Sequence, residues 1–463
     1  MRAALLLVSL LSGISGATAK AAGSLPARGP RPAEPTAVPA GHRMTVHQWE
    51  RRFLAHDRSA SRLQGYDVAG TGPGGWPNGC KQAWQRPNAF WWFWSEHCVD
   101  AAIKMWEATG KTAYLERSLA YYEGAMASAV AVKDLTRAHA LSVGCTDAYV
   151  AVRGGCTGSS YASRPDASTY KGWHGWGHGA GTASGDEYAL YEGEAWVYAP
   201  HLLLEMKARG LDMDPTYRHR YGALLSFIKQ HVWEKWYVRG TSPGAWFYRI
   251  STYMSVMWAH IAMNLYLLSD PDDPRYTQYR DVYWNLNKAP GIPIHVRTAG
   301  HDIYHASLRD TQWRPRPDGS AEFSEDWNAW TPHQTNYYGD RQVFFMIQCV
   351  RRDPACVWTS NDLQRLSKTF THYIWKGPAG TNCHASRVDG VGCGGATSNP
   401  SGKATGAYHL GWSRLGRYDT PLGREIQRRL ELYESKLNMG WPISRAASGA
   451  LNARLLQRGR KCQ

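Results

Sequence analysis

The chain repeats one kind of unit, in which an aromatic-rich helix, a short polar turn and an amphipathic helix follow one another. The turns carry a glycine after the first helix, as at Gly110 and Gly210, or an Asp-Pro step before the second. Both are helix-end signals. Five such pairs can be recognised, at residues 88–130, 185–236, 246–287, 331–377 and 406–437. Helices of this kind bury their apolar faces on one another, so the sequence predicts an all-α fold.

The arrangement of these pairs can also be predicted. The pairs differ in length, and a further pair is expected in the irregular stretch before Asn88. An open solenoid would show a tighter repeat period. We therefore expect an (α/α) toroid, or barrel, of about six or seven helical hairpins, with the first helix of each pair on the inside.

The first helices carry polar residues on one face. The stretch from Trp246 to Tyr266 is apolar enough to be a buried helix. At about 100° per residue, however, one face of that helix carries a stripe of polar residues. This stripe consists of Arg249, Tyr253, His260 and Asn264. Corresponding stripes are Glu187, Tyr191, Glu194 and Tyr198 in the second pair, and His333, Tyr337 and Asp340 in the fourth. Buried polar groups need partners, so we expect the stripes to line a wet central cleft, although His260 also suits a packed core.

Aromatic residues predict the kind of ligand that such a cleft binds. Trp91, Trp92 and Trp94 lie in the first helix, and sugar rings stack on aromatic faces. Core packing is the alternative for each of them. The glycine-rich segment GWHGWGHG, residues 172–179, is expected to be a loop that presents His174 and His178 to a substrate. The two histidines lack an acidic partner at a metal-binding spacing, so we predict no metal and no cofactor.

The N-terminal residues predict export. Arg2 precedes a short apolar run that ends in small residues, which is the pattern of a signal peptide. We expect a signal peptide at residues 1–19, a Pro/Ala-rich leader at 20–45 and a single domain at 46–463, secreted or periplasmic. No later apolar run predicts a membrane span.

The net charge of +15 then favours an anionic polymer as the partner, because an exported protein seldom meets nucleic acid. The alternative is that the excess charge only solvates the surface, as the basic tail at residues 453–463 would. The oligomeric state is left open.

Nine cysteines in an exported chain predict local disulfides. The closest spacings pair Cys145 with Cys156, Cys349 with Cys356, and Cys383 with Cys393, and a weaker candidate pairs Cys80 with Cys98. None of these spacings resembles a zinc site.

Three motifs on successive hairpins carry a family resemblance: YEGEAW (Tyr191–Trp196), YRISTY (Tyr248–Tyr253) and TPHQTNYYGDR (Thr331–Arg341). With them the chain resembles the (α/α)-toroid polysaccharide lyases, in particular alginate and glucuronan lyases such as polysaccharide lyase family 38. The resemblance covers most of residues 46–440. It implies a secreted lyase that cleaves a uronic-acid polysaccharide by β-elimination.

Such a reaction removes the proton on C5 of the uronate, which requires a base, an acid and neutralisation of the sugar carboxylate. Arg249 is the predicted carboxylate clamp, with His178 or His333 beside it. The resemblance assigns the base and acid roles to Tyr253 and the role of protonated neutraliser to Glu194. A structural hydrogen bond at a helix start is the alternative for Arg249 and Tyr253, and helix capping is the alternative for His333.

The predicted catalytic residues are thus Tyr253, Arg249, Glu194 and His333. The predicted substrate-binding residues are Trp91, Trp94, His174, His178, Glu187, Tyr191, Tyr337 and Arg341. Two other classes stay open. A glycoside hydrolase on the same ring would use paired carboxylates, with candidates Asp186, Glu187, Glu194 and Asp340, and a non-catalytic glycan-binding protein would need only the aromatic residues and the charge.

Overall fold

The computed structural model describes residues 44–62, 89–132, 169–173, 189–238, 247, 252–288, 296–298, 301–303, 307–310, 312–324, 332, 339–376, 383–385, 387–391, 412–418, 420–436 and 442–459. The chain divides between residues 41 and 42, within the expected leader, and all described residues belong to the unit formed by residues 42–463. The described residues are mostly helical, as the sequence predicts. Among the described helices, none has an apolar stretch of the length needed to cross a bilayer.

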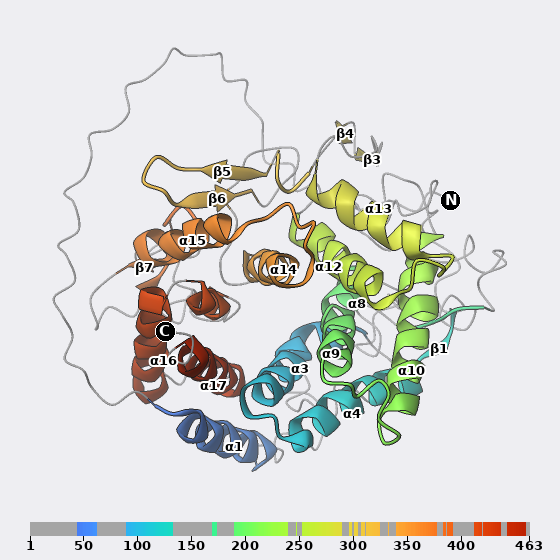
Figure 1. Ribbon diagram of the computed structural model, residues 1–463, viewed down its shortest axis with the longest axis horizontal. Helices are drawn as coiled ribbons and strands as arrows, with labels where there is room; N and C mark the ends of the chain where they lie inside the picture. Colours follow the sequence, from blue (N-terminus) through green and yellow to red (C-terminus); the bar gives the residue numbers. More distant parts are fainter. Residues whose placement is uncertain are drawn as a thin grey trace, which may run out of the picture. The chain divides into compact units, whose positions relative to one another are not determined.

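One series of helices, here called the core series, carries most of the buried polar residues. It consists of α3 (Ala89–Thr109), α8 (Ala189–Trp196), α9 (Tyr198–Lys207), α12 (Thr252–Leu268), α14 (Gly339–Arg352), the 3₁₀ helix η8 (Trp412–Arg417) and α17 (Pro442–Gly459). Each member packs against the next, from α3 to α8, from α8 and α9 to α12, and then through α14 and η8 to α17. The last member, α17, packs against α3 (Figure 1).

A second series covers the first. It consists of α1 (Val46–Arg62), α4 (Thr112–Ser128), α10 (Arg218–Phe227), the π-helix η4 (Ile228–Glu234), α11 (Lys235–Tyr237), α13 (Tyr276–Asn287), α15 (Ser360–Thr369), the π-helix η6 (Phe370–Ile374) and α16 (Thr420–Lys436). Its helices pack on their core-series neighbours: α4 on α3, α10 on α9, α13 on α12, α15 on α14, and α16 on η8 as well as on α17. The expected pairs are therefore present.

The helix ends follow the sequence signals. Gly110 ends α3 and Gly210 follows α9, with φ of 73° and 72°, a left-handed conformation that glycine adopts without strain. At the start of α15, the Thr359 side chain accepts from the backbone N–H of Asp362, and the Asp362 carboxylate accepts from the Thr359 N–H at 2.9 Å. This capping box fixes the first turn of α15.

Among the described residues, four antiparallel strand pairs lie outside the helices, and the sequence did not predict them. They are β1 (Val130–Ala131) with β2 (Lys171–Gly172), β3 (Val296–Thr298) with β4 (His301–Ile303), β5 (Trp313–Pro315) with β6 (Ala321–Phe323), and β7 (Trp375–Lys376) with β8 (Cys383–His384). Each strand has two or three residues. The pairs β3–β4, β5–β6 and β7–β8 join neighbouring segments, whereas β1 pairs with a strand far along the chain.

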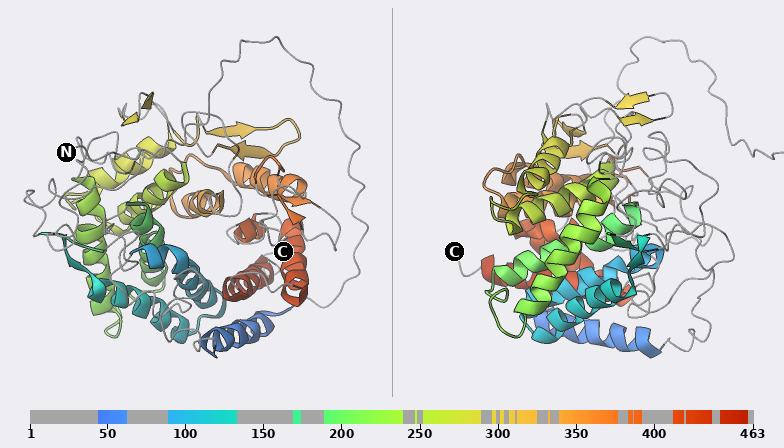
Figure 2. Two further views of the ribbon diagram at one scale, coloured as in Figure 1. Left: turned by 180° about the vertical axis from the view of Figure 1, so that it is seen from behind. Right: turned by 90° about the vertical axis from the view of Figure 1, so that its right-hand side faces the viewer.

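The two ends of the described chain form the sixth helix pair. A pair was expected before Asn88, and α1 lies in that stretch, but α1 packs against α17 from the other end of the sequence (Figures 1 and 2). Residues 453–459 of the basic tail belong to α17, which buries Ala453 and Leu456 and leaves Arg458 exposed.

The contact between α1 and α17 depends on Gly449. A Cβ added there would lie 2.5 Å from the Cδ2 and Cε2 atoms of the Trp49 indole, which is fully buried. We expect Gly449→Ala to lower the free energy of unfolding by about 1–3 kcal/mol, because the buried helices must move apart. Urea unfolding measures the change.

The matched control for this variant is Gly222→Ala in α10, where an added Cβ has no atom within 4 Å. That change should raise stability by about 0.5–1 kcal/mol, because alanine favours the helix. Equal effects of the two variants would show that α1 does not pack on α17 as described.

One expected disulfide is present among the described residues: Cys349 and Cys356 are bonded, with Cα atoms 5.5 Å apart. Cys98 is also disulfide-bonded. Cys80, Cys145, Cys156 and Cys393 lie outside the described residues.

Candidate functional site

The core-series helices α3, α8–α9, α12 and α14 run in the same direction. Residues early in these helices pair with one another, as Arg341 does with Glu96 and Glu194. Residues late in them also pair, as His201 does with Glu107 and Arg351 with Glu205. The Oγ1 of Thr252, the first residue of α12, donates to Ser324 O at 2.7 Å, and Ser324 bridges to Pro332 in the segment before α14. The N-terminal ends of these helices therefore lie at one end of the core series.

Near that end, one guanidinium holds two carboxylates. Arg341 pairs with Glu96 of α3 and Glu194 of α8, and all three side chains are buried. We call these three residues the Arg341 cluster. Burial raises the pKa of Glu96 to about 7, against the opposing charge of Arg341. The Glu96 carboxyl is thus poised to carry a proton near neutral pH while remaining hydrogen-bonded to a cation.

About one turn after Glu96 in α3, charged groups of α3, η8 and α14 meet. Asp100 pairs with Lys104 and, at 2.9 Å, with Arg414 of η8, and these cations hold the pKa of Asp100 low although burial opposes them. Burial raises the pKa of Asp340 to about 7, and Asp100 and Glu96 add to that rise while Lys104 and Arg414 oppose it. The core series therefore holds two carboxyls, on Glu96 and Asp340, that titrate near pH 7.

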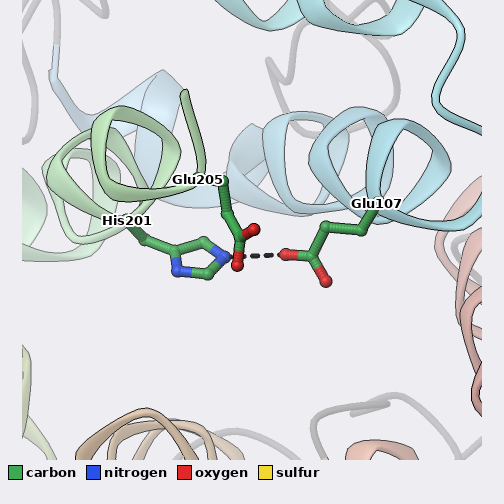
Figure 3. A group of neighbouring side chains, drawn as sticks. All are labelled: Glu107, His201 and Glu205. Atoms are coloured by element: carbon green, nitrogen blue, oxygen red, sulfur yellow. Dashed lines mark hydrogen bonds and ion pairs between the residues drawn. The ribbon is translucent and has the colours of Figure 1, made fainter. Parts of the chain in front are cut away.

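Glu107, in the last turn of α3, lies beside His201 and Glu205 of α9 (Figure 3). The Nε2 atom of His201 lies 2.9 Å from a Glu107 carboxylate oxygen, and one ligand atom from each of the three residues lies within 4.8 Å of the others. Arginines already occupy these carboxylates: Arg351 and Arg352 bind Glu205, and Arg414 lies 3.6 Å from Glu107. Three guanidiniums would repel a cation, so this group is better explained as an ion-pair network than as a metal centre.

Helix α12 contributes Tyr253, His260 and Asn264, all buried. His260 packs edge-on against Phe344 and Phe345, at 4.8 and 5.7 Å between ring centroids. Burial lowers its pKa well below the ordinary value, so the ring is neutral. Within the described part of the chain, His260 Nε2 and both amide atoms of Asn264 have no hydrogen-bond partner. Three of the four residues of the predicted stripe are therefore buried in α12, and Arg249 lies outside the described residues.

The structure describes only some of the predicted site residues. Arg341 and Glu194 are brought together, while Tyr191 and Tyr253 lie in the first turns of α8 and α12. Trp91 and Trp94 belong to α3, without described side chains. Arg249, His333, His174, His178, Glu187 and Tyr337 lie outside the described residues. Every predicted residue thus falls within the first two turns of a core-series helix or in the segment that precedes one.

Sequence reasoning missed the charged stripe of α3. Glu96, Asp100, Lys104 and Glu107 recur at spacings of four, four and three residues in an otherwise apolar helix. That spacing places them on one face, so the signal was available. The arginines of η8 gave no such signal, because a 3₁₀ helix as short as Trp412–Arg417 shows no periodic pattern.

Glu192, which lies off the α8 stripe, has a different partner. Its carboxylate accepts from Lys235 Nζ at 2.7 Å and from Trp236 Nε1 at 2.8 Å, and both residues are fully buried. Glu192 therefore ties α8 to the covering helix α11.

The raised pKa of Glu96 makes stability depend on pH. The folded protein keeps the Glu96 proton up to about pH 7, whereas the unfolded chain releases it near pH 4.5. The stabilising contribution is therefore full below about pH 4.5 and is lost as the pH rises to 7. Between pH 5 and 8, the wild type should lose on the order of 2–3 kcal/mol of unfolding free energy relative to Glu96→Gln, measured by urea unfolding.

A control of opposite sign is Glu50→Gln. Lys111 and the Tyr114 hydroxyl hold the pKa of Glu50 below its ordinary value although burial opposes them. Its stabilisation is present above pH 4.5 and lost in acid, so Glu50→Gln should differ from the wild type more at neutral than at acid pH. If the unfolding free energies of the wild type and Glu96→Gln changed with pH in parallel, the protonation of Glu96 would be contradicted.

Comparison of this chain with protein-family models, with curated proteins and with solved structures gave no match.

Proposed function

We propose that this protein is a secreted polysaccharide lyase that cleaves a uronic-acid polymer by β-elimination, on an (α/α) toroid of the kind found in the lyases that it resembles. The contacts of the core series support the toroid. They run from α3 through α8, α12, α14, η8 and α17 back to α3, and each core helix has a covering partner. A cycle of this kind is what six hairpins closed into a ring require.

The observation that carries the proposal is the Arg341 cluster. Eliminating the sugar bonded to O4 of a uronate needs a neutralised substrate carboxylate, and a buried arginine with a protonated carboxyl can supply that neutralisation. The raised pKa of Glu96 favours Glu96 as the protonated donor, whereas the sequence alone suggested Glu194. Glu194 then remains the carboxylate that balances Arg341.

Tyr253 is the proposed base, one turn nearer the helix N-termini than the cluster. The ring contacts of His260 with Phe344 and Phe345 set the register between α12 and α14. Tyr253 precedes His260 by two turns of α12, and Arg341 precedes Phe344 and Phe345 by about one turn of α14. Tyr253 therefore lies about one turn closer to the helix N-termini than Arg341. A phenolate there would take the C5 proton, the C4–O4 bond would break as the C4–C5 double bond forms, and the phenol would return a proton to the leaving oxygen.

The test is to incubate the protein with alginate, glucuronan and hyaluronan and to follow two signals. A lyase produces the ultraviolet absorbance of an unsaturated uronate together with new reducing ends. Reducing ends without that absorbance identify a hydrolase, and retention on the polymer with neither signal identifies a binding protein. Either of the last two outcomes refutes the lyase.

One observation favours a glycoside hydrolase as the second candidate. Glu96 and Asp340 both have a pKa raised to about 7. The charge of Asp100 raises the pKa of both, and the charge of Glu96 also raises the pKa of Asp340. A general acid in a hydrolase needs such a pKa, and a paired carboxylate would be the base. The ultraviolet absorbance of the unsaturated uronate decides between the two enzymes, because both produce new reducing ends.

A further inference from the structure

The C-terminal ends of the core-series helices collect arginines. Because α3, α8–α9 and α14 run in the same direction, the last turns of α3, α9 and α14 lie at one end. Arg458 of α17 and Arg417 of η8 lie close enough to act on Arg209 and on Arg351, respectively, so they belong to the same end. Arg351 and Arg352 at the end of α14 bind Glu205 of α9, and Arg209 just beyond α9 stacks over Trp106 of α3 at 4.0 Å. The arginine cluster, as we call it, consists of Arg209, Arg351, Arg352, Arg414, Arg417 and Arg458.

The positive charge of this cluster exceeds what the described residues neutralise. Arg414 pairs with Asp100 and lies near Glu107, and Arg351 and Arg352 share Glu205. Arg209, Arg417 and Arg458 have no carboxylate of the described residues within ion-pair distance. Basic residues at helix ends also interact favourably with the helix dipole, but each end carries only about half a negative charge. The ends of α3, α9, α14 and α17 together with two glutamates therefore leave guanidinium charge in excess.

The mutual effects of these arginines agree with that excess. Burial lowers the pKa of Arg209, and Arg458 and Arg351 lower it further, although Glu205 and Glu107 oppose them. Burial also lowers the pKa of Arg417, and Arg351 lowers it further. Arginines that repel one another in this way are stabilised when an anion binds between them.

Three members of the cluster, Arg209, Arg351 and Arg458, are exposed to solvent. They come from three different helix ends, so their guanidinium groups can bind several anionic groups of one extended molecule. A polymer with a carboxylate on successive sugars fits this arrangement and the net charge of +15.

We propose that the arginine cluster is a second docking site, which binds an acidic polysaccharide at the end of the core series opposite Tyr253. The choice of a polysaccharide as the anion rests on the proposed function, whereas the excess of guanidinium charge does not. A chain held there would keep the enzyme on its polymer between cleavage events.

The experiment compares two triple variants with the same loss of charge. One removes the exposed members of the cluster, as Arg209→Gln, Arg351→Gln and Arg458→Gln, while Arg352 keeps its pair with Glu205. The matched control changes Arg218, Arg280 and Arg424 to Gln, which are exposed arginines of α10, α13 and α16. Binding to alginate, with neutral dextran as the control polymer, is titrated at low and at physiological salt.

The cluster variant should bind alginate about tenfold more weakly, as expected for three lost exposed ion pairs, while the control changes less than twofold. Cleavage of a short oligosaccharide should be unchanged in both. Equal weakening in the two variants, or alginate binding by the cluster variant at the wild-type level, overturns the proposal. If no protein forms an unsaturated product but the tenfold difference remains, the lyase fails and the docking site stands.

Discussion

Replacing Arg341 with methionine should lower the free energy of unfolding by about 3–5 kcal/mol, because the change leaves Glu96 and Glu194 buried without their shared cation. Removing one partner of a buried ion pair costs more than the pair contributes, since the remaining charge is neither solvated nor paired. Methionine keeps most of the volume of the side chain, so the loss reports charge rather than a cavity. Urea unfolding at neutral pH measures the change.

Two variants isolate the electrostatic cause. The exposed pair of Arg280 with Asp281 is the control, and Arg280→Met should change stability by less than about 1 kcal/mol. In a Glu96→Gln and Glu194→Gln background, Arg341→Met should cost much less, because no buried carboxylate is left behind. An undiminished loss in that background would mean that Arg341 acts through packing alone.

The local structure was predictable because its signals are local. The glycine stops at Gly110 and Gly210 and the amphipathic patterns place many helix ends within a few residues of those observed. The described parts of α12 and α14 begin later, at Thr252 and Gly339, than the predicted starts at Trp246 and Thr331. The pairing of α1 with α17 could not be found in this way, because no periodic pattern links the two ends of a sequence. It depends on a close approach of Gly449 to Trp49, 400 positions away.

The candidate site, too, could be predicted only in part. The stripe on α12 and the carboxylate of Glu194 follow from helical spacing, so sequence reasoning located them. The partner of Glu194 is Arg341, and that arginine also binds Glu96 across 245 positions of the chain. Which buried carboxyl carries a proton depends on these distant charges. Assigning the protonated carboxyl to Glu96 instead of Glu194 therefore required the three-dimensional structure.

Replacing Tyr253 with phenylalanine should abolish most of the proposed elimination, with kcat reduced about 10²–10⁴-fold, because the phenol is the group that both takes and returns the proton. The ring is buried at the start of α12 and phenylalanine preserves its packing, so the fold should be retained. The measurement is the initial rate of unsaturated uronate formation across a range of substrate concentrations, together with an unfolding curve for each protein.

The matched control is Tyr221→Phe, which removes a phenol from the covering helix α10. A loss confined to Tyr253→Phe and expressed in kcat assigns proton transfer, because a group that only binds the sugar would mainly raise KM. Wild-type kcat in Tyr253→Phe would exclude this tyrosine as the base. The C5 proton would then have to go to another group near the first turns of the core series, and Asp340, with its pKa of about 7, would be the described residue to examine next.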